Sequence, residues 1–284
     1  MCRRAFTMSR ARSGTHDPVR TIRQQSHGPC AVATVLTCRA NDPRTHPLRG
    51  IRSMLRRGRA VPSVLENWCS SPTPAESRSP SPRSPGAILH THRGQIPHDC
   101  LIGLDEGSIA TSTRGIDYLV QRPQLDDYVL GMPRQAAVIY PKDAARIVAL
   151  GDVGSGSRVL EAGVGSGALT CYLLKAAGPT GTVTSVERRS DFAEVARENV
   201  SRWFGGTPRS WTLHEMDLVD VTESDIPTGS RDTLILDMLS PWECLDVADR
   251  VLRAGGSLVS YVATTTQLSH LVESMRLSRR WTEP

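Results

Sequence analysis

Residues 159–167 read V-L-E-A-G-V-G-S-G, and this stretch decides the fold. A short apolar run ends in three glycines on alternate positions, and residues 168–177 continue with a pattern typical of a helix. Glycine allows a positive φ and lets a ligand approach the backbone closely. The stretch therefore predicts a strand, then a tight turn that faces a ligand, and then a helix.

Strand-like and helix-like segments alternate around this turn. Pro141 suits the first position of a helix, because that position has no use for the backbone donor that proline lacks. The alternation predicts an α/β fold with a parallel, doubly wound sheet. The expected strands are residues 158–162, 182–186, 211–214, 233–239 and 257–262, and the expected helices are residues 124–132, 141–150, 168–177, 191–204, 242–253 and 265–277.

The spacing of the glycines distinguishes between cofactors. G-x-G-x-G differs from the G-x-G-x-x-G fingerprint of dinucleotide-binding folds, and no Lys-Ser or Lys-Thr pair follows it as in a P-loop. The shorter turn favours S-adenosylmethionine (SAM). The alternative is that the glycines serve only the geometry of a strand–helix turn.

Three acidic residues follow expected strands, at the edge where open α/β sheets bind ligands. Glu187 is placed to accept hydrogen bonds from ribose hydroxyls, and Asp217 to accept one from an adenine amino group. Asp237 begins the run D-M-L-S-P-W and is placed to face the methyl-transfer position of a SAM fold. The alternatives are solvated loop carboxylates or, for Asp237, an acid at a helix N-terminus. DNA methyltransferases that modify amino groups carry the motif D/N-P-P-Y/F/W at this point. Here three residues separate the acid from the Pro-Trp pair, so that class fits poorly.

Several separated motifs together resemble the tRNA adenine-58 N1-methyltransferases, particularly the actinobacterial form. They are the glycine turn, H-T-H-R-G at 90–94, V-I-Y-P-K-D at 138–143, D-M-L-S-P-W-E at 237–243 and Y-V-A-T-T-T-Q-L at 261–268. The resemblance covers about residues 88–284. It implies a class I SAM-dependent methyltransferase fold (Rossmann-like) behind a small N-terminal β domain, usually as a homotetramer that acts on the T-loop of tRNA.

The resemblance also implies which residues bind the cofactor. Glu187 would hold the ribose and Asp217 the adenine, while Asp237 would lie beside the reactive group. Phe192 is a weaker candidate for the wall of the cofactor site, with a core position as its alternative. The methionine part would contact Gly163, Gly165, Ser166, Gly167, Ala168 and Leu169.

For catalysis, the resemblance implies that Asp237 is the acidic catalytic residue and that Tyr140 and Tyr261 flank the target adenine. A half-buried core position is the alternative for each tyrosine. Two other functions stay open. One is another class I methyltransferase, acting on protein carboxyl groups or on small-molecule hydroxyls. The other is an inactive remnant that binds SAM and holds tRNA.

Charge divides the chain into two parts. Residues 1–100 hold 16 Arg, no Lys and 5 acidic residues, a net charge of +11, whereas the rest carries 18 basic and 24 acidic residues, a net charge of −6. The Arg-, Ser- and Pro-rich residues 1–87 cannot bury enough apolar surface, so we expect them to be mostly disordered. These residues could act as an RNA-binding arm, an organelle transit peptide or a linker to a partner. The alternative is that they are a gene-model artefact.

We therefore expect three parts: a leader at 1–87, a remnant of an N-terminal domain with a connecting segment at 88–135, and the catalytic domain at 136–284. The sheet is expected to lack its last two strands, which would leave an uncovered edge prone to aggregation. Seven scattered cysteines without a C-x-x-C pair indicate a reducing compartment, and the resemblance implies the cytoplasm. We expect no metal site, and no apolar run is long enough to cross a membrane.

Overall fold

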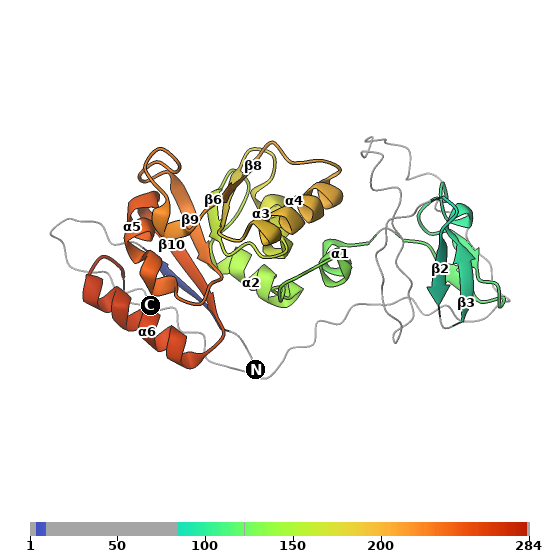
Figure 1. Ribbon diagram of the computed structural model, residues 1–284, viewed down its shortest axis with the longest axis horizontal. Helices are drawn as coiled ribbons and strands as arrows, with labels where there is room; N and C mark the ends of the chain where they lie inside the picture. The colour runs from blue at the N-terminus through green and yellow to red at the C-terminus, as the bar shows by residue number, and fades with distance from the viewer. Residues whose placement is uncertain (1–3, 10–84, 92, 122, 283–284) are drawn as a thin grey trace, which may run out of the picture. The chain divides into compact units, whose positions relative to one another are not determined.

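The computed structural model describes residues 4–9, 85–91, 93–121 and 123–282. Its main feature is a six-stranded sheet with the spatial order β1-β10-β9-β6-β7-β8 (Figure 1). Neighbouring strands from β10 to β8 pair in parallel, and β1 pairs with β10 in the antiparallel sense. The strands are β1 Arg4–Ser9, β6 Arg158–Ala162, β7 Thr182–Glu187, β8 Trp211–Glu215, β9 Arg231–Leu236 and β10 Leu252–Val262.

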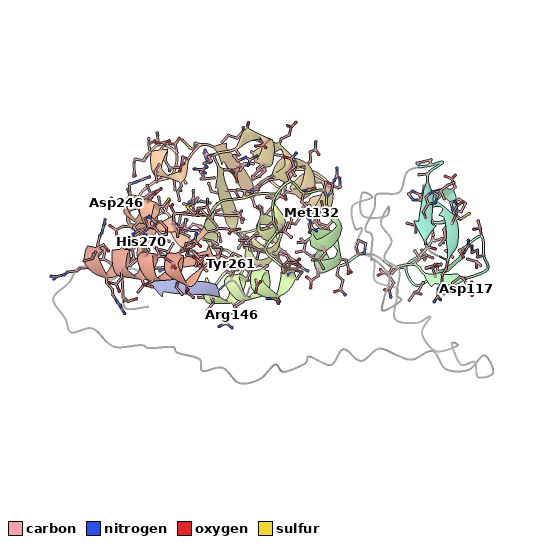
Figure 2. The ribbon with its side chains drawn as sticks, turned by 60° about the horizontal axis from the view of Figure 1, so that its bottom comes forward. Asp117, Met132, Arg146, Asp246, Tyr261 and His270 are labelled. Carbon is pink, nitrogen blue, oxygen red and sulfur yellow. The ribbon has the colours of Figure 1, made fainter. Side chains whose placement is uncertain are left out.

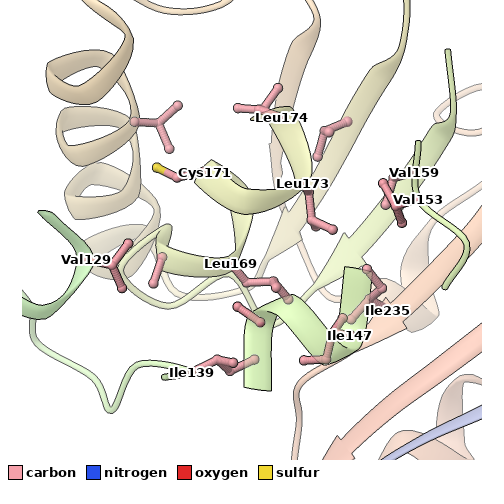
Figure 3. Close-up of a cluster of buried hydrophobic side chains, with 14 of the residues drawn as sticks. Val129, Ile139, Ile147, Val153, Val159, Leu169, Cys171, Leu173, Leu174 and Ile235 are labelled. Atoms are coloured by element: carbon pink, nitrogen blue, oxygen red, sulfur yellow. The ribbon is translucent and has the colours of Figure 1, made fainter. Parts of the chain in front are cut away.

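Helices cover both faces of this sheet, because successive strand residues point to opposite faces. Val159 and Ile235 pack against α1, α2, α3 and α4 in one core (Figure 3), whereas Leu160 and Leu234 pack against α5 and α6 in the other. The doubly wound α/β arrangement expected from the sequence is therefore confirmed. The helices are α1 Leu125–Gly131, α2 Pro141–Leu150, α3 Ala168–Ala177, α4 Ser190–Phe204, α5 Leu245–Val251 and α6 Thr265–Ser278, with short 3-10 turns η3 His98–Cys100, η4 Leu218–Asp220 and η5 Pro241–Cys244.

Several element bounds differ from the expected ones by a single residue, and the larger differences lie at β9, α5 and β10. The fourth strand of the chain's α/β alternation, β9, ends at Leu236, so Asp237 lies just beyond it. The helix expected at 242–253 is divided into η5 and α5 and ends at Val251, because Leu252 has an extended backbone with φ −75° and ψ 135°. A bulge then interrupts the pairing of β10 with β9 after Leu252.

The edge that was expected to lie uncovered is paired. β1 lies antiparallel to β10, with Arg4 opposite Val262 at the start of the register. The expectation of an open edge at residues 257–262 is therefore wrong, because a segment of the leader takes the antiparallel edge position. The remainder of the predicted disordered leader, apart from residues 85–87, lies outside the described residues.

Two β-hairpins form a separate small cluster near the start of the segment expected at 88–135. β2 Ile88–Thr91 pairs with β3 Gly94–Pro97, and β4 Ile109–Thr111 pairs with β5 Asp117–Leu119. A hydrogen bond of 2.9 Å between Thr91 Oγ1 and Tyr118 Oη joins the two hairpins. Their hydrophobic core consists of Ile96, Leu101, Ala110, Tyr118 and Val120.

Candidate active site

A cavity of about 430 Å³ lies at the carboxyl ends of β6, β7, β8 and β9. Each of these strands is followed by residues that line it, which is the arrangement expected for a ligand site in an open α/β sheet. Six of the residues selected from the sequence meet at its wall: Gly163, Gly165, Glu187, Phe192, Asp217 and Asp237. Ser166, Gly167, Ala168 and Leu169 are not part of this lining.

The glycine turn and Asp237 are in direct backbone contact. The N–H of Asp237 donates to the carbonyl of Ala162 at 3.0 Å. Gly163 has a φ of +86°, and a Cβ atom added there would lie 2.0 Å from the carbonyl oxygen of Asp237. A glycine is therefore required at residue 163 for two reasons, its backbone angle and this close approach.

Glu187 is 6% exposed and joins two parts of the cavity wall. Its Oε2 accepts from the N–H of Gly165 and its Oε1 from the N–H of Arg189, each at 3.1 Å. These bonds fix the orientation of the carboxylate, while each oxygen keeps a further lone pair for a ligand hydroxyl.

Asp217 is held at the N-terminus of η4. Its Oδ1 accepts from the N–H of Val219 at 3.3 Å, and its Oδ2 lies 3.6 Å from a guanidinium nitrogen of Arg188. Phe192 lies half-buried in the wall, where the guanidinium carbon of Arg189 lies 3.7 Å from its ring centroid. The ring therefore borders the cavity while also supporting a charged side chain.

The two predicted tyrosines are close to each other but outside the cavity lining. Tyr140 is the N-cap residue of α2 and is 55% exposed, whereas Tyr261 on β10 is 4% exposed. Asp143 connects them, because its N–H donates to the carbonyl of Tyr140 at 2.9 Å and its Oδ2 accepts from Tyr261 Oη at 3.1 Å. The role of these tyrosines beside a target base stays a prediction.

Sequence reasoning missed a buried carboxylate beneath the turn. Glu161 is 1% exposed, and its Oε2 accepts from Thr170 Oγ1 at 2.7 Å and from Ser185 Oγ at 2.8 Å. Ser185 Oγ in turn accepts from Trp211 Nε1 at 2.9 Å. Burial raises the pKa of Glu161 to about 7. The available signal was an acidic residue inside an apolar strand.

A second missed residue is Asn199 on α4, which supports the turn from the side. Its Nδ2 donates to the carbonyl of Pro133 at 2.7 Å and to that of Ser166 at 3.0 Å. The backbone carbonyl of Asn199 accepts a hydrogen bond from Tyr128 Oη at 2.7 Å. No sequence signal marked this residue, because nothing in a helical pattern shows which polar side chain is buried.

Other chemistry was sought among the described residues. Burial raises the pKa of the Cys244 thiol to about 11, and that of Cys171 is raised further for the same reason, so neither forms a thiolate near neutral pH. Over the described part of the chain, no group of three His, Cys, Asp or Glu residues is arranged to hold a metal ion. Within the same residues, no helix is both long and apolar enough to span a bilayer.

Comparison with protein families places the chain. The family described as the tRNA methyltransferase complex GCD14 subunit matches residues 116–283, which is more than half of the sequence. The chain belongs to this tRNA methyltransferase family. A further family, TrmI-like N-terminal, matches residues 84–110, the part that includes the first hairpin.

Two curated proteins illustrate the similarity of this chain to tRNA methyltransferases. The tRNA (adenine(58)-N(1))-methyltransferase TrmI of Thermus thermophilus is 35% identical over 191 residues, which cover 66% of this chain and 72% of the relative. The tRNA (adenine(57)-N(1)/adenine(58)-N(1))-methyltransferase TrmI of Methanocaldococcus jannaschii is 30% identical over 199 residues, covering 63% of this chain and 70% of the relative.

Two solved structures have the same fold. A SAM-dependent O-methyltransferase from Thermotoga maritima gives a TM-score of 0.68 at 27% identity, covering 78% of this chain and 82% of that one. The tRNA (m1A58) methyltransferase TrmI from Aquifex aeolicus gives 0.62 at 27% identity, covering 70% and 76%. The class I SAM-dependent methyltransferase fold expected for this GCD14-family chain is confirmed.

Proposed function

We propose that the protein transfers a methyl group from SAM to N1 of adenine 58 in the T-loop of tRNA. Membership in a tRNA methyltransferase family and the activities named for its relatives support this proposal. The observation that carries it is the contact between Asp237 and Gly163. This contact is made by the backbone carbonyl of Asp237, and both residues line the same cavity.

The residues of the cavity fit SAM. Gly163 and Gly165 line the cavity with backbone, against which the methionine part would lie. Glu187 would accept from the ribose hydroxyls and Asp217 from the adenine amino group, and Phe192 forms part of the wall. When bound, SAM supplies an electrophilic methyl group.

The chain's own contribution to the chemistry is to place and polarise the target base. Adenine N1 carries a lone pair and no proton, so no strong base is required. Asp237 accepts a hydrogen bond from the N6 amino group, which orients the ring and stabilises the positive charge that develops on it. N1 lies on the Watson–Crick edge, so the base has to be unpaired or extruded before it enters.

Tyr140 is the better placed of the two tyrosines to flank this base, because more than half of its side chain is exposed. Tyr261 can flank it only after a local opening, since its hydroxyl is held by Asp143. We propose tRNA as the macromolecular partner, a homotetramer as the assembly and the cytoplasm as the location. Phosphate contacts are expected from residues 1–100, whose net charge of +11 contrasts with −6 for the remainder.

The domain organisation follows from the same proposal. Residues 136–284 form the catalytic part, and β1 from the leader at 1–87 completes its sheet. Residues 88–135 comprise the small N-terminal hairpins and the connection to the catalytic part.

The test is methyl transfer from labelled SAM to an unmodified tRNA transcript, with the product nucleoside identified by mass spectrometry. We expect 1-methyladenine with the 284-residue chain and none with Asp237→Ala. A transcript with guanine at position 58 is the matched control for the site of methylation. If folded protein that binds SAM modifies an aspartyl peptide instead of tRNA, the proposed substrate is wrong.

A further inference from the structure

The segment that carries Asp237 is anchored on its inner side. We call residues 237–244 the acid segment. Its first residue is bound to Ala162 and packed against Gly163, as described above. Farther along, the thiol of Cys244 donates to Met238 Sδ at 3.5 Å. Both contacts lie on the side of the segment that faces the sheet and the second core.

The middle of the acid segment has no such support from its own side chain. Leu239 lies on the cavity wall, yet its side chain is 73% exposed. Side-chain packing therefore cannot hold this part of the segment in place. Its backbone is held instead, because Gln267 Nε2 on α6 donates to the carbonyl of Leu239 at 2.9 Å.

A second contact from α6 lies one turn farther along the helix. The rings of His270 and Trp242 pack with centroids 4.1 Å apart and an angle of 39° between their planes. Figure 2 labels His270 on this helix. Residues three apart share one face of a helix, so Gln267 and His270 contact the acid segment at two points, Leu239 and Trp242.

The amide of Gln267 performs two separable tasks. Its Oε1 accepts from the N–H groups of Ala263 and Thr264 and from Thr264 Oγ1, each at 3.1 Å, while Thr264 Oγ1 accepts from the N–H of Gln267. These bonds cap α6, and a glutamate could make those that accept from the backbone. Only the Nε2 of glutamine can also donate to Leu239.

We propose that Gln267 and His270 are positioning residues for methyl transfer, which hold the acid segment so that Asp237 meets the target base. This inference rests on the proposed function, in which Asp237 is the catalytic residue. The inner contacts fix the backbone of Asp237 itself, and the contacts from α6 hold the backbone at Leu239 and the ring of Trp242. Both sets of contacts are needed, because a small displacement of Asp237 from the target base lowers the rate by a large factor.

Gln267→Glu separates the two tasks, because it keeps an acceptor for the helix cap and removes the donor to Leu239. We expect kcat on tRNA to fall about tenfold, with the SAM dissociation constant and the KM for tRNA changed by less than about twofold. Thr264→Ala is the matched control. It removes the Thr264 Oγ1 part of the cap and should lower Tm by about 3 °C while leaving kcat within about twofold of the starting protein.

His270→Ala should lower kcat about threefold, and the double variant should fall below either single variant. Hydrogen exchange at residues 238–244, measured without tRNA, should be faster in Gln267→Glu than in Thr264→Ala. Equal exchange and equal kcat in these two variants would overturn the inference and reduce Gln267 to a helix cap. Hydrogen exchange tests whether Gln267 and His270 hold the acid segment even if the starting protein does not methylate tRNA. Absence of tRNA methylation would count against the proposed function alone.

Discussion

The glycine turn and the acid segment form adjoining parts of the cavity wall and are built in different ways. The turn is a local structure, in which three glycines follow a buried strand and lead directly into α3. The acid segment leaves β9 and reaches its place through contacts with β6 and α6, which are distant in the chain. The comparison shows that one cavity combines a wall encoded in nine consecutive residues with a wall that depends on long-range contacts.

The largest effect is expected where the two walls touch. Gly163→Ala would place a methyl group 2.0 Å from the carbonyl oxygen of Asp237, at a φ of +86° that disfavours any side chain. We expect loss of SAM binding and a fall of more than about 4 kcal/mol in the free energy of unfolding. Calorimetry and thermal unfolding measure these quantities.

Gly154→Ala is the matched control for this substitution, because nothing lies within 4 Å of a Cβ atom at residue 154 and its φ is not in the positive range. If Gly163→Ala binds SAM as tightly as Gly154→Ala does, the two walls are not in the close contact described here.

The next largest effect isolates the acid segment. Asp237→Asn keeps the side-chain shape but replaces one acceptor oxygen with a donor and removes the charge. We expect kcat for tRNA methylation to fall about 10²- to 10³-fold, with the SAM dissociation constant within about twofold. An equal loss of SAM affinity and of rate would assign Asp237 to cofactor binding rather than to the target base.

A smaller effect is expected on the side of the glycine turn. Glu187→Gln should weaken SAM binding about tenfold, because a charged acceptor for ribose hydroxyls becomes a neutral amide. Titration calorimetry measures the affinity. Glu198→Gln, on the exposed surface of α4, is the control and should bind SAM normally. An unchanged affinity in Glu187→Gln would remove this residue from the cofactor site.

The last effect, on stability and not on activity, concerns the carboxyl group beneath the turn. Glu161 has a pKa of about 7 in the folded chain against 4.5 when unfolded, so the folded state holds the proton more tightly between these values. The contribution of this group to stability is therefore present below about pH 4.5 and is lost as the pH rises to about 7. It amounts to at most about 3 kcal/mol. Glu161→Gln should flatten the pH dependence of unfolding in this range, as measured by denaturant titration. The same slope in both proteins would mean that Glu161 ionises normally.

The strands and the turn were predictable because their signals are local. The strand at 158–162 and the helix at 168–177 have the predicted bounds, since an apolar run, three glycines and a helical period lie next to one another. The bounds of β9 and α5 were less accurate, because they depend on pairing with other strands: β9 pairs with β6 only as far as Leu236, and Leu252 pairs with Arg231 of β9.

Pairing across the sheet edge was not predictable at all. Residues 4–9 carry no local signal that connects them with β10, so the sequence alone predicts an open edge there. The same limit applies to Asn199, whose importance depends on which carbonyls it reaches.

The sequence by itself determined the α/β class, the order of the strands and helices over residues 124–277, the glycine turn and the acidic residues at the strand ends. These features follow from periodicity and from the backbone freedom of glycine, which act over a few residues. The tertiary structure alone decided that Gly163 touches Asp237, that Glu161 is buried with a raised pKa, and that α6 holds the acid segment. Such contacts join residues far apart in the chain, and their distances exist only once both cores have packed.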